Sequence, residues 1–253
     1  MAFFVDKDSI VRKIWGKGDT ILFIFAGASA EFALNKAVDW LYFTGRLPSD
    51  PLGRLFSTVS YARQIVFSDY DKALYAIDKI TAIHKSVEED RGAEIPDWAY
   101  RDVLFMLIDY SIRSFEVLER RLTVNEKADV FDVFNRVGLR MRIKGLPDTY
   151  HDWLIMREDH LQQNLICSKF TSDLYQQYRK HLGWPRYLLL KQAQVMVVPE
   201  RVNSLLFLGK IPLLTPVLGL YKFSRLLKLD WLLKDAILPK EYKAQIKDLD
   251  VRA

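Results

Sequence analysis

The sequence predicts an all-α protein, and three observations support this prediction. Apolar residues recur every three to four positions along most of the 253 residues, which is helical spacing, and almost no stretch alternates like a strand. Helix-start and helix-stop signals separate these periodic segments. Half of the residues are apolar and 13% are aromatic, which is enough to build a large core with an internal pocket.

The chain shows no repeat, low-complexity tract or long flexible linker, so we expect a single domain over residues 1–253. Its core should cover about residues 8–235, and residues 236–253 form a C-terminal tail. Cys167 is the one cysteine, which rules out an intrachain disulfide and favours a reducing compartment. The first 13 residues lack the pattern of a signal peptide. The expected location is therefore cytoplasmic.

The charge balance is only mildly basic. The 37 Lys and Arg residues against 32 Asp and Glu give a formal net charge of +5, well short of the dense basic stripe of a nucleic-acid binder, so no nucleic-acid partner is expected. Residues 20–34 are apolar but too short to cross a bilayer, and they include Glu31, which predicts a buried helix. Residues 205–234 mix apolar and basic residues and contain Pro212 and Pro216. They suit either a helical hairpin that covers the core or peripheral contact with a membrane.

Two consecutive helices are predicted in the first third of the chain. Asp50 followed by Pro51 is a helix start, because the carboxylate caps free N–H groups and proline fits the first turn, and the helix then runs to residue 67. Residues 68–87 form the next helix, and a charged loop follows at 88–97. One face of that helix carries a buried stripe at three- and four-residue spacing: Ala73, Ile77, Ile80, His84 and Val87.

Four further helices are predicted after residue 97. Residues 98–122 form a long helix that is apolar on nearly every side of its first half, so it should be central. Thr123 and Glu126 make a capping-box pattern at the start of the next helix, which ends before Gly145. Two helices follow, with breaks at residues 181–187 and 197–203.

The four histidines differ in their surroundings, and common catalytic motifs are missing. No glycine-rich phosphate loop, G-x-S-x-G turn, H-E-x-x-H or paired cysteine occurs. His151 and His160 flank a charged stretch, which favours a solvated helix face, and His181 reads as a cation at a helix C-terminus. His84 lies in an apolar stripe. A buried imidazole is either neutral and hydrogen-bonded in the core or used as a ligand.

A second polar group lies one helix earlier. Arg54, Ser57, Thr58 and Tyr61 are three, four and seven residues apart and share one side of the helix. This side is either a solvent-facing edge or an anion site in an apolar cleft, because a guanidinium can pair with a carboxylate. Together with an inward His84, such an arrangement would suit haem, with the histidine on iron and the arginine on the propionates.

Six segments, in this order and spacing, resemble the rubber-oxygenase-like family, which includes latex clearing protein and the fungal prenyl-cleaving oxygenase of mycophenolic acid synthesis. They are DSIVRKIWGKGDTILFIFAGASAE, DPLGRLFSTVSYARQIVFSD, ITAIHKSV, IDYSIRSFEVLERRLT, GLPDTYHDW and VMVVPERVNSLLFL. The likeness runs over about residues 8–235 and is strongest over residues 50–116.

The resemblance implies a globin-like all-α core with an internal haem pocket that holds haem b. The family's axial histidine corresponds to His84, its pocket arginine to Arg54 and its pocket threonine to Thr58. Ser57 stands where latex clearing protein has a lysine that can occupy the distal iron position. The family's central-helix histidine is replaced in the VLF run at residues 103–105. A further family block, at Asp109, Arg113 and Glu116, also fits an ordinary ion-pair ladder, and we interpret it as structural.

The function that the resemblance implies is a haem-dependent oxygenase that uses O₂ on an apolar, isoprenoid or otherwise unsaturated small molecule. Two alternatives stay open from the residues alone. The chain could be a non-catalytic helical protein that keeps the fold and binds haem or a lipid in its apolar cavity. Residues 205–234 could instead make it a membrane-surface scaffold.

Overall fold

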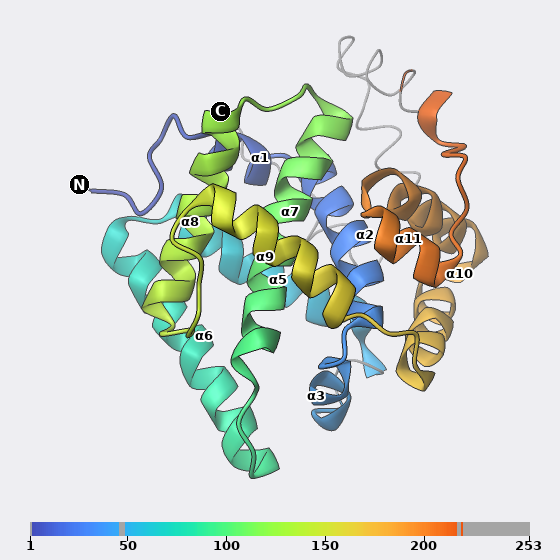
Figure 1. Ribbon diagram of the computed structural model, residues 1–253, viewed down its shortest axis with the longest axis horizontal. Coiled ribbons are helices and arrows are strands. Elements are labelled where there is room, and N and C mark those ends of the chain that lie inside the picture. The colour runs from blue at the N-terminus through green and yellow to red at the C-terminus, as the bar shows by residue number, and fades with distance from the viewer. Residues whose placement is uncertain (1, 46–48, 217–218, 220–253) are drawn as a thin grey trace.

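The computed structural model describes residues 2–45, 49–216 and 219, and over these residues the protein is all-α, as predicted (Figure 1). No strand occurs in this part, only two isolated bridges. The helices are α1 (Ile10–Trp15), α2 (Gly18–Leu34), α3 (Val38–Phe43), α5 (Pro51–Phe67), α6 (Tyr70–Arg91), α7 (Asp97–Leu118), α8 (Val124–Arg140), α9 (Tyr150–Gln163), α10 (Lys169–Val197) and α11 (Glu200–Leu206).

Helices α2 and α7 form the centre of the molecule and pack against each other (Figure 1). Both are apolar on most sides, which is the pattern of a helix surrounded by other helices. Gly27 lets the two backbones approach closely, because a Cβ atom at this position would lie 2.2 Å from Cδ1 of Tyr110. The predictions of a buried helix at residues 20–34 and of a central helix after residue 97 are therefore confirmed.

The predicted helix starts agree with the capping hydrogen bonds. The Gly53 N–H donates to Asp50 Oδ1 over 2.8 Å, and Pro51 occupies the first turn of α5. Asp69 caps α6 in the same way, by accepting from the Lys72 N–H. The capping box of Thr123 and Glu126 is present at α8. Helix α6 continues to Arg91, so the predicted charged loop is shorter than residues 88–97, and Gly92 ends the helix in the left-handed conformation.

The two predicted breaks in the last third also occur. Helix α10 is kinked at Gly183, whose φ of 71° is left-handed, and Pro185 follows within the next turn. Val198 and Pro199 separate α10 from α11. His181 lies just before the kink, near the end of the first segment of α10. This place agrees with its predicted position at a helix C-terminus.

A buried charge network joins α2, α7 and α9. The guanidinium of Arg157 donates to both carboxylate oxygens of Glu31, over 2.5 and 2.6 Å, and to Asp109 Oδ2 over 3.0 Å. Tyr110 donates its hydroxyl to Glu31 over 2.7 Å. Asp109 also accepts from Arg113, as the predicted ladder requires.

Glu116 departs from that ladder. Its carboxylate pairs with Lys127 over 2.8 Å and accepts from the Leu122 N–H, instead of pairing with Arg113. The ladder prediction is therefore right for its first two members. Glu116 joins the end of α7 to α8, a contact between segments that intrahelical spacing does not specify.

Part of the predicted C-terminal organisation lies outside the described residues. Residues 217–218 and 220–234 of the apolar and basic segment, and the tail at 236–253, belong to that part. Within the described part, the main core cluster draws on residues from Phe4 to Val197. Among the same residues, none of the helices is both long and apolar enough to cross a bilayer. The globin-like architecture and the single domain stay predictions.

Candidate functional site

Helix α5 brings Arg54, Ser57 and Thr58 together, as their spacing predicts. The Arg54 Nη1 donates to Thr58 Oγ1 over 2.8 Å and to Ser57 Oγ over 3.3 Å. Both hydroxyls also donate their protons to the Arg54 carbonyl. Each hydroxyl oxygen can therefore accept a hydrogen bond from the guanidinium through a lone pair. These bonds hold the guanidinium along the helix. Thr58 is partly buried and Ser57 is exposed.

The stripe on α6 that carries His84 is buried at its start and becomes partly accessible toward its end. Ala73 and Ile77 are fully enclosed, whereas Ile80, His84 and Val87 retain some exposure. The prediction that this face points inward is correct for its first half. His84 lies where the stripe leaves the core, with one part of its ring enclosed and another facing a pocket.

The imidazole of His84 is in an environment that keeps it neutral. Burial, reinforced by the positive charge of Arg54, lowers its pKa to about 4, although Glu88 and the Ile80 backbone act in the opposite direction. Its Nδ1 atom is buried and has no hydrogen-bond partner of good geometry within the described residues. A neutral ring with an unsatisfied nitrogen is costly as plain core and is suited to act as a ligand.

Tyr100 and Glu88 fix one side of the His84 ring. The Tyr100 ring, from α7, meets the imidazole edge to face, with centroids 5.2 Å apart and an angle of 89°. Its hydroxyl donates to Glu88 Oε1 over 3.0 Å, and the Ile95 N–H donates to the same oxygen over 2.9 Å. The loop between α6 and α7 thus holds the aromatic ring that packs on His84.

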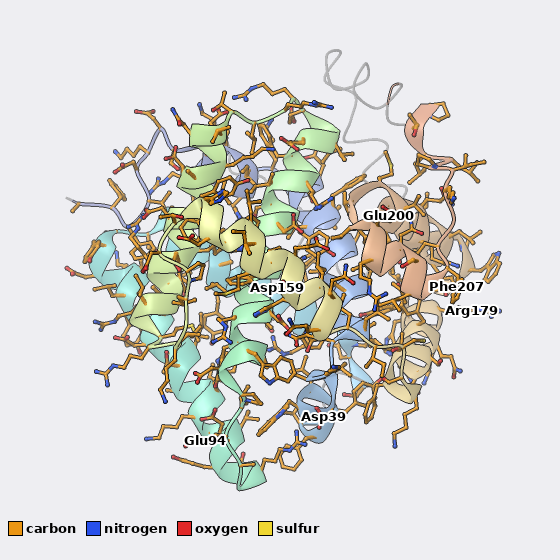
Figure 2. All side chains as sticks on the ribbon, in the orientation of Figure 1. Asp39, Glu94, Asp159, Arg179, Glu200 and Phe207 are labelled. Carbon is orange, nitrogen blue, oxygen red and sulfur yellow. The ribbon has the colours of Figure 1, made fainter. Side chains whose placement is uncertain are left out.

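His84 also lines a pocket of about 470 Å³ between α6, the start of α7 and the loop after α8. Most of its lining is polar or charged: Thr81, Lys85, Glu88, Glu94, Asp97, Tyr100, Arg142 and Lys144. Figure 2 shows Glu94 at the tip of the α6–α7 hairpin, at the margin of the molecule. Such a charged lining does not offer the apolar faces that a porphyrin needs. This pocket is therefore not the apolar pocket that a haem would need.

Helix α3 is joined to the end of α6 near this site. The Arg91 guanidinium, two turns after His84, lies over the Trp40 ring at 3.9 Å and over the Phe43 ring at 5.5 Å. It also pairs with Asp39 over 2.7 Å. Asp39 is labelled on α3 in Figure 2. These contacts place aromatic side chains of α3 beside the C-terminal half of α6.

Two of the three groups that a haem would need, a neutral imidazole and a nearby cation, are present here, whereas the described pocket at His84 is not apolar. A b-type haem requires a neutral imidazole for the iron, a cation near its propionates and apolar side chains around the ring. His84 is neutral at pH 7, and the positive charge of Arg54 is one of the causes that lower its pKa. Over the described residues, no three His, Cys, Asp or Glu side chains gather as a metal-binding group. A haem takes a single side-chain ligand on this face.

The remaining histidines correct one prediction. His160 is buried, not on a solvated face: its Nδ1 pairs with Asp102 Oδ1, and its ring packs on Phe105 with centroids 5.1 Å apart. The side-chain amides of Asn35 and Asn164 donate to the same carboxylate. Figure 2 labels Asp159, the preceding residue, which is exposed. His151 is exposed, as predicted.

Sequence reasoning missed this group because its members come from α2, α7 and α9. A weak signal existed, since an aspartate in the apolar half of a central helix needs a partner. Asp102 lies in such a position. Its partner, His160, lies 58 positions away in the sequence, and residue spacing does not indicate which distant residue pairs with Asp102.

The comparison with protein families decides what kind of protein this is. The family model for the catalytic domain of the ER-bound oxygenase mpaB/B′ and rubber oxygenase matches residues 13–229. The chain belongs to this family. Its catalytic domain is thus an oxygenase domain, which implies O₂ and an oxidisable substrate as partners. A search of curated proteins found no match.

Proposed function

We propose that this oxygenase domain uses haem b, bound through His84, to oxidise an apolar and unsaturated small molecule. The oxygenase part rests on the family match over residues 13–229. The haem part rests on one observation: a buried His84 Nδ1 that makes no hydrogen bond of good geometry, in a ring kept neutral by burial and by the charge of Arg54. When bound, the haem would supply the iron at which O₂ is activated.

Each site residue has a distinct role in this proposal. His84 would donate its unprotonated nitrogen to the iron, and its low pKa means that protons do not compete at neutral pH. Arg54, oriented by Thr58, would neutralise a propionate. Ser57 has its hydroxyl proton on the Arg54 carbonyl, so it would help to orient Arg54 and would not itself hold the haem.

Apolar side chains near His84 support an apolar substrate. Ile83, the neighbour of His84, is 43% exposed, and Val103, one turn after Tyr100 on α7, is 40% exposed. Phe43 on α3 is 49% exposed and lies near Arg91. Small-molecule sites are lined mostly by apolar side chains, so accessible apolar groups near His84 favour an apolar ligand. An isoprenoid-like chain is a substrate of this kind.

The test is whether His84 is needed to hold haem. Purified protein titrated with hemin should develop a Soret band, and His84→Gly should lose it while keeping its helical circular dichroism. Added imidazole should then restore the band, because it can occupy the space that the side chain leaves. His151→Gly, which removes an exposed histidine from α9, is the control and should bind hemin normally. Wild-type protein that takes up no hemin would exclude the proposal.

The non-catalytic alternative makes a different prediction for the same proteins. The replacement of the family's central-helix histidine, and the apolar and basic C-terminal segment, are the features that favour it. A binding protein would take up haem or a lipid without consuming O₂. Oxygen uptake with unsaturated apolar compounds that exceeds the uptake by the His84→Gly protein would rule out this alternative, whereas equal uptake would favour it.

A further inference from the structure

Phe207 occupies a conformation and an exposure that the fold itself does not explain. It ends α11 with a φ of 51°, which is left-handed, and glycine or asparagine adopts this conformation at lower cost. Its ring is 88% exposed. A bulky apolar side chain held in a strained backbone position and facing solvent stabilises nothing within the described part of the chain. Such outliers are a reason to look for a function outside the fold.

Further exposed apolar residues surround Phe207 along one edge of the molecule. In the segment after it, Ile211 is 74% and Leu213 is 66% exposed. The Leu213 N–H donates to Gln192 on α10 over 2.8 Å, which places this segment on the α10 surface. Trp184 and Leu188, also exposed, lie two turns and one turn, respectively, before Gln192 on the same face of α10. We call these five apolar residues and their surroundings the α10–α11 surface.

The segment that carries the α10–α11 surface is also rich in positive charge. Residues 179–213 contain six cations, Arg179, Lys180, Arg186, Lys191, Arg201 and Lys210, and one acid, Glu200. This balance of +5 equals the formal net charge of the whole chain, so the other residues are neutral in sum. Figure 2 shows Arg179 and Phe207 at the same edge of the molecule. Arg179 packs over the Trp184 ring at 4.7 Å, which joins the charge to the apolar side chains.

We propose that the α10–α11 surface docks on an anionic lipid bilayer. Exposed Phe, Trp, Ile and Leu side chains beside Lys and Arg are the combination that enters the interfacial region of a membrane while contacting acidic headgroups. The proposal does not depend on haem or on oxygenase activity. It gives an apolar substrate dissolved in the bilayer a short path to the protein.

Charge argues against other partners for this surface. A second copy bound through the same face would place cations opposite cations, because a two-fold interface is self-complementary. Residues 217–234 of the chain carry Lys222, Arg225, Lys228 and Lys234 against Asp230, so they too would bring positive charge. A nucleic acid is anionic but offers no hydrocarbon for Ile211 and Leu213. A bilayer offers both.

The main test uses Phe207→Gly with the full chain. Glycine relieves the left-handed strain, so the variant should unfold at the same temperature as wild type or higher. Its cosedimentation with vesicles of phosphatidylcholine and phosphatidylserine should fall severalfold. Tyr75→Ala removes an aromatic ring of similar exposure, 68%, from α6 and should bind vesicles like wild type. A lowered melting temperature for Phe207→Gly would mean that the ring is covered by the chain itself, and would overturn the proposal.

A charge-matched pair of variants tests the electrostatic part. Lys191→Gln with Lys210→Gln removes two cations from the α10–α11 surface, and each cation near an anionic membrane contributes about fivefold to binding. Lys13→Gln with Lys79→Gln gives the same net charge but alters α1 and α6, and should leave vesicle binding nearly unchanged. Equal losses for both pairs would show nonspecific attraction and contradict a defined docking surface.

Two further observations complete the test. Binding to the acidic vesicles should weaken as salt rises from about 0.1 to 1 M, and Trp184 fluorescence should shift to the blue on binding, a shift that Trp184→Phe should reduce. Preference for a single-stranded RNA over the vesicles in competition would overturn the proposal. So would failure to sediment with acidic vesicles at low salt. Neither result would affect the hemin experiment on His84, so the two proposals fail separately.

Discussion

His84 combines two properties that ordinary core histidines do not share. Its ring is kept neutral by burial and by Arg54, and its buried Nδ1 makes no hydrogen bond of good geometry among the described residues, although the Ile80 backbone lies close enough to influence its pKa. His160 shows the ordinary arrangement, because its Nδ1 pairs with Asp102. An imidazole whose buried nitrogen is hydrogen-bonded stabilises the fold, whereas one without such a bond has a nitrogen that can act as a metal ligand.

The low pKa of His84 predicts a pH dependence of stability in the haem-free protein. The unfolded chain binds a proton near pH 6.5, whereas the folded protein does so only near pH 4. Between these values the unfolded state holds more protons, so the free energy of unfolding should fall as the pH is lowered from 6.5 to 4, by about 3 kcal/mol in total. Urea unfolding at several pH values, together with the His84 ring resonances in NMR, measures this.

His84→Gln provides the reference for that measurement, because the other histidines titrate in both proteins. Subtracting its stability from that of wild type at each pH isolates the contribution of His84. A His84 resonance that titrates near pH 6.5, with no difference between the two stability curves, would show that the imidazole is solvated. The lowered pKa of His84 would then be wrong, and with it the argument that burial sets this ring apart from a surface histidine.

At the scale of elements, the contact between α2 and α7 depends on a glycine. Gly27 lies against the Tyr110 ring, and that ring cannot turn away easily because its hydroxyl is bonded to buried Glu31. Gly138, on α8, lies instead against the methyl ends of Leu104 and Leu146, which can change rotamer. The same added methyl group therefore meets a rigid neighbour in one helix and flexible neighbours in the other.

We predict that Gly27→Ala destabilises the protein and that Gly138→Ala changes it little. The first variant overpacks the α2–α7 contact, and such changes cost about 1–3 kcal/mol. In the second, a gain in helix propensity of up to about 1 kcal/mol offsets the local repacking. Thermal unfolding followed by circular dichroism compares the two variants. Equal melting temperatures would mean that α2 and α7 can move apart without cost.

Burial along α6 shows how far a pattern can be read at this scale. Three- and four-residue spacing correctly identified the inward face, because it follows from helix geometry alone. The spacing did not predict that burial decreases from Ile77 toward Val87, because this decrease depends on where the neighbouring helices end. The same geometry correctly joined Arg54 to Ser57 and Thr58 within α5. It could not specify that Tyr100 and Glu88 hold the His84 ring.

At the scale of the whole molecule, Arg157 joins three helices through two buried carboxylates. The neighbouring negative charges raise its pKa, and Arg157 and Arg113 lower that of Asp109 against the effect of burial. Arg157 and Asp109 are therefore both charged at neutral pH. Removing one member of a buried ion pair leaves the others unpaired in a medium that solvates them poorly, which is more costly than losing a surface pair.

Arg157→Met should therefore lower the free energy of unfolding by about 3–5 kcal/mol. The matched control is Arg140→Met. Arg140 also donates two hydrogen bonds to one carboxylate, that of Asp78, over 2.8 and 2.6 Å, but this pair lies at the surface between α8 and α6. That pair should contribute less than about 1 kcal/mol. Denaturant unfolding of both variants measures this difference. Similar decreases in the free energy of unfolding would show that the buried network stabilises the protein no more than a surface ion pair does.

The sequence by itself determined the helices, their caps and kinks, and the pairing of Arg54 with its hydroxyl neighbours, because these depend on residues within a few positions of one another. It also carried the segments that place the chain in an oxygenase family. Tertiary structure decided which charges are buried together. Glu31 with Arg157, and Asp102 with His160, are set by the packing of α2, α7 and α9. Contacts across distant segments depend on how helices pack, and local spacing contains no information about that choice.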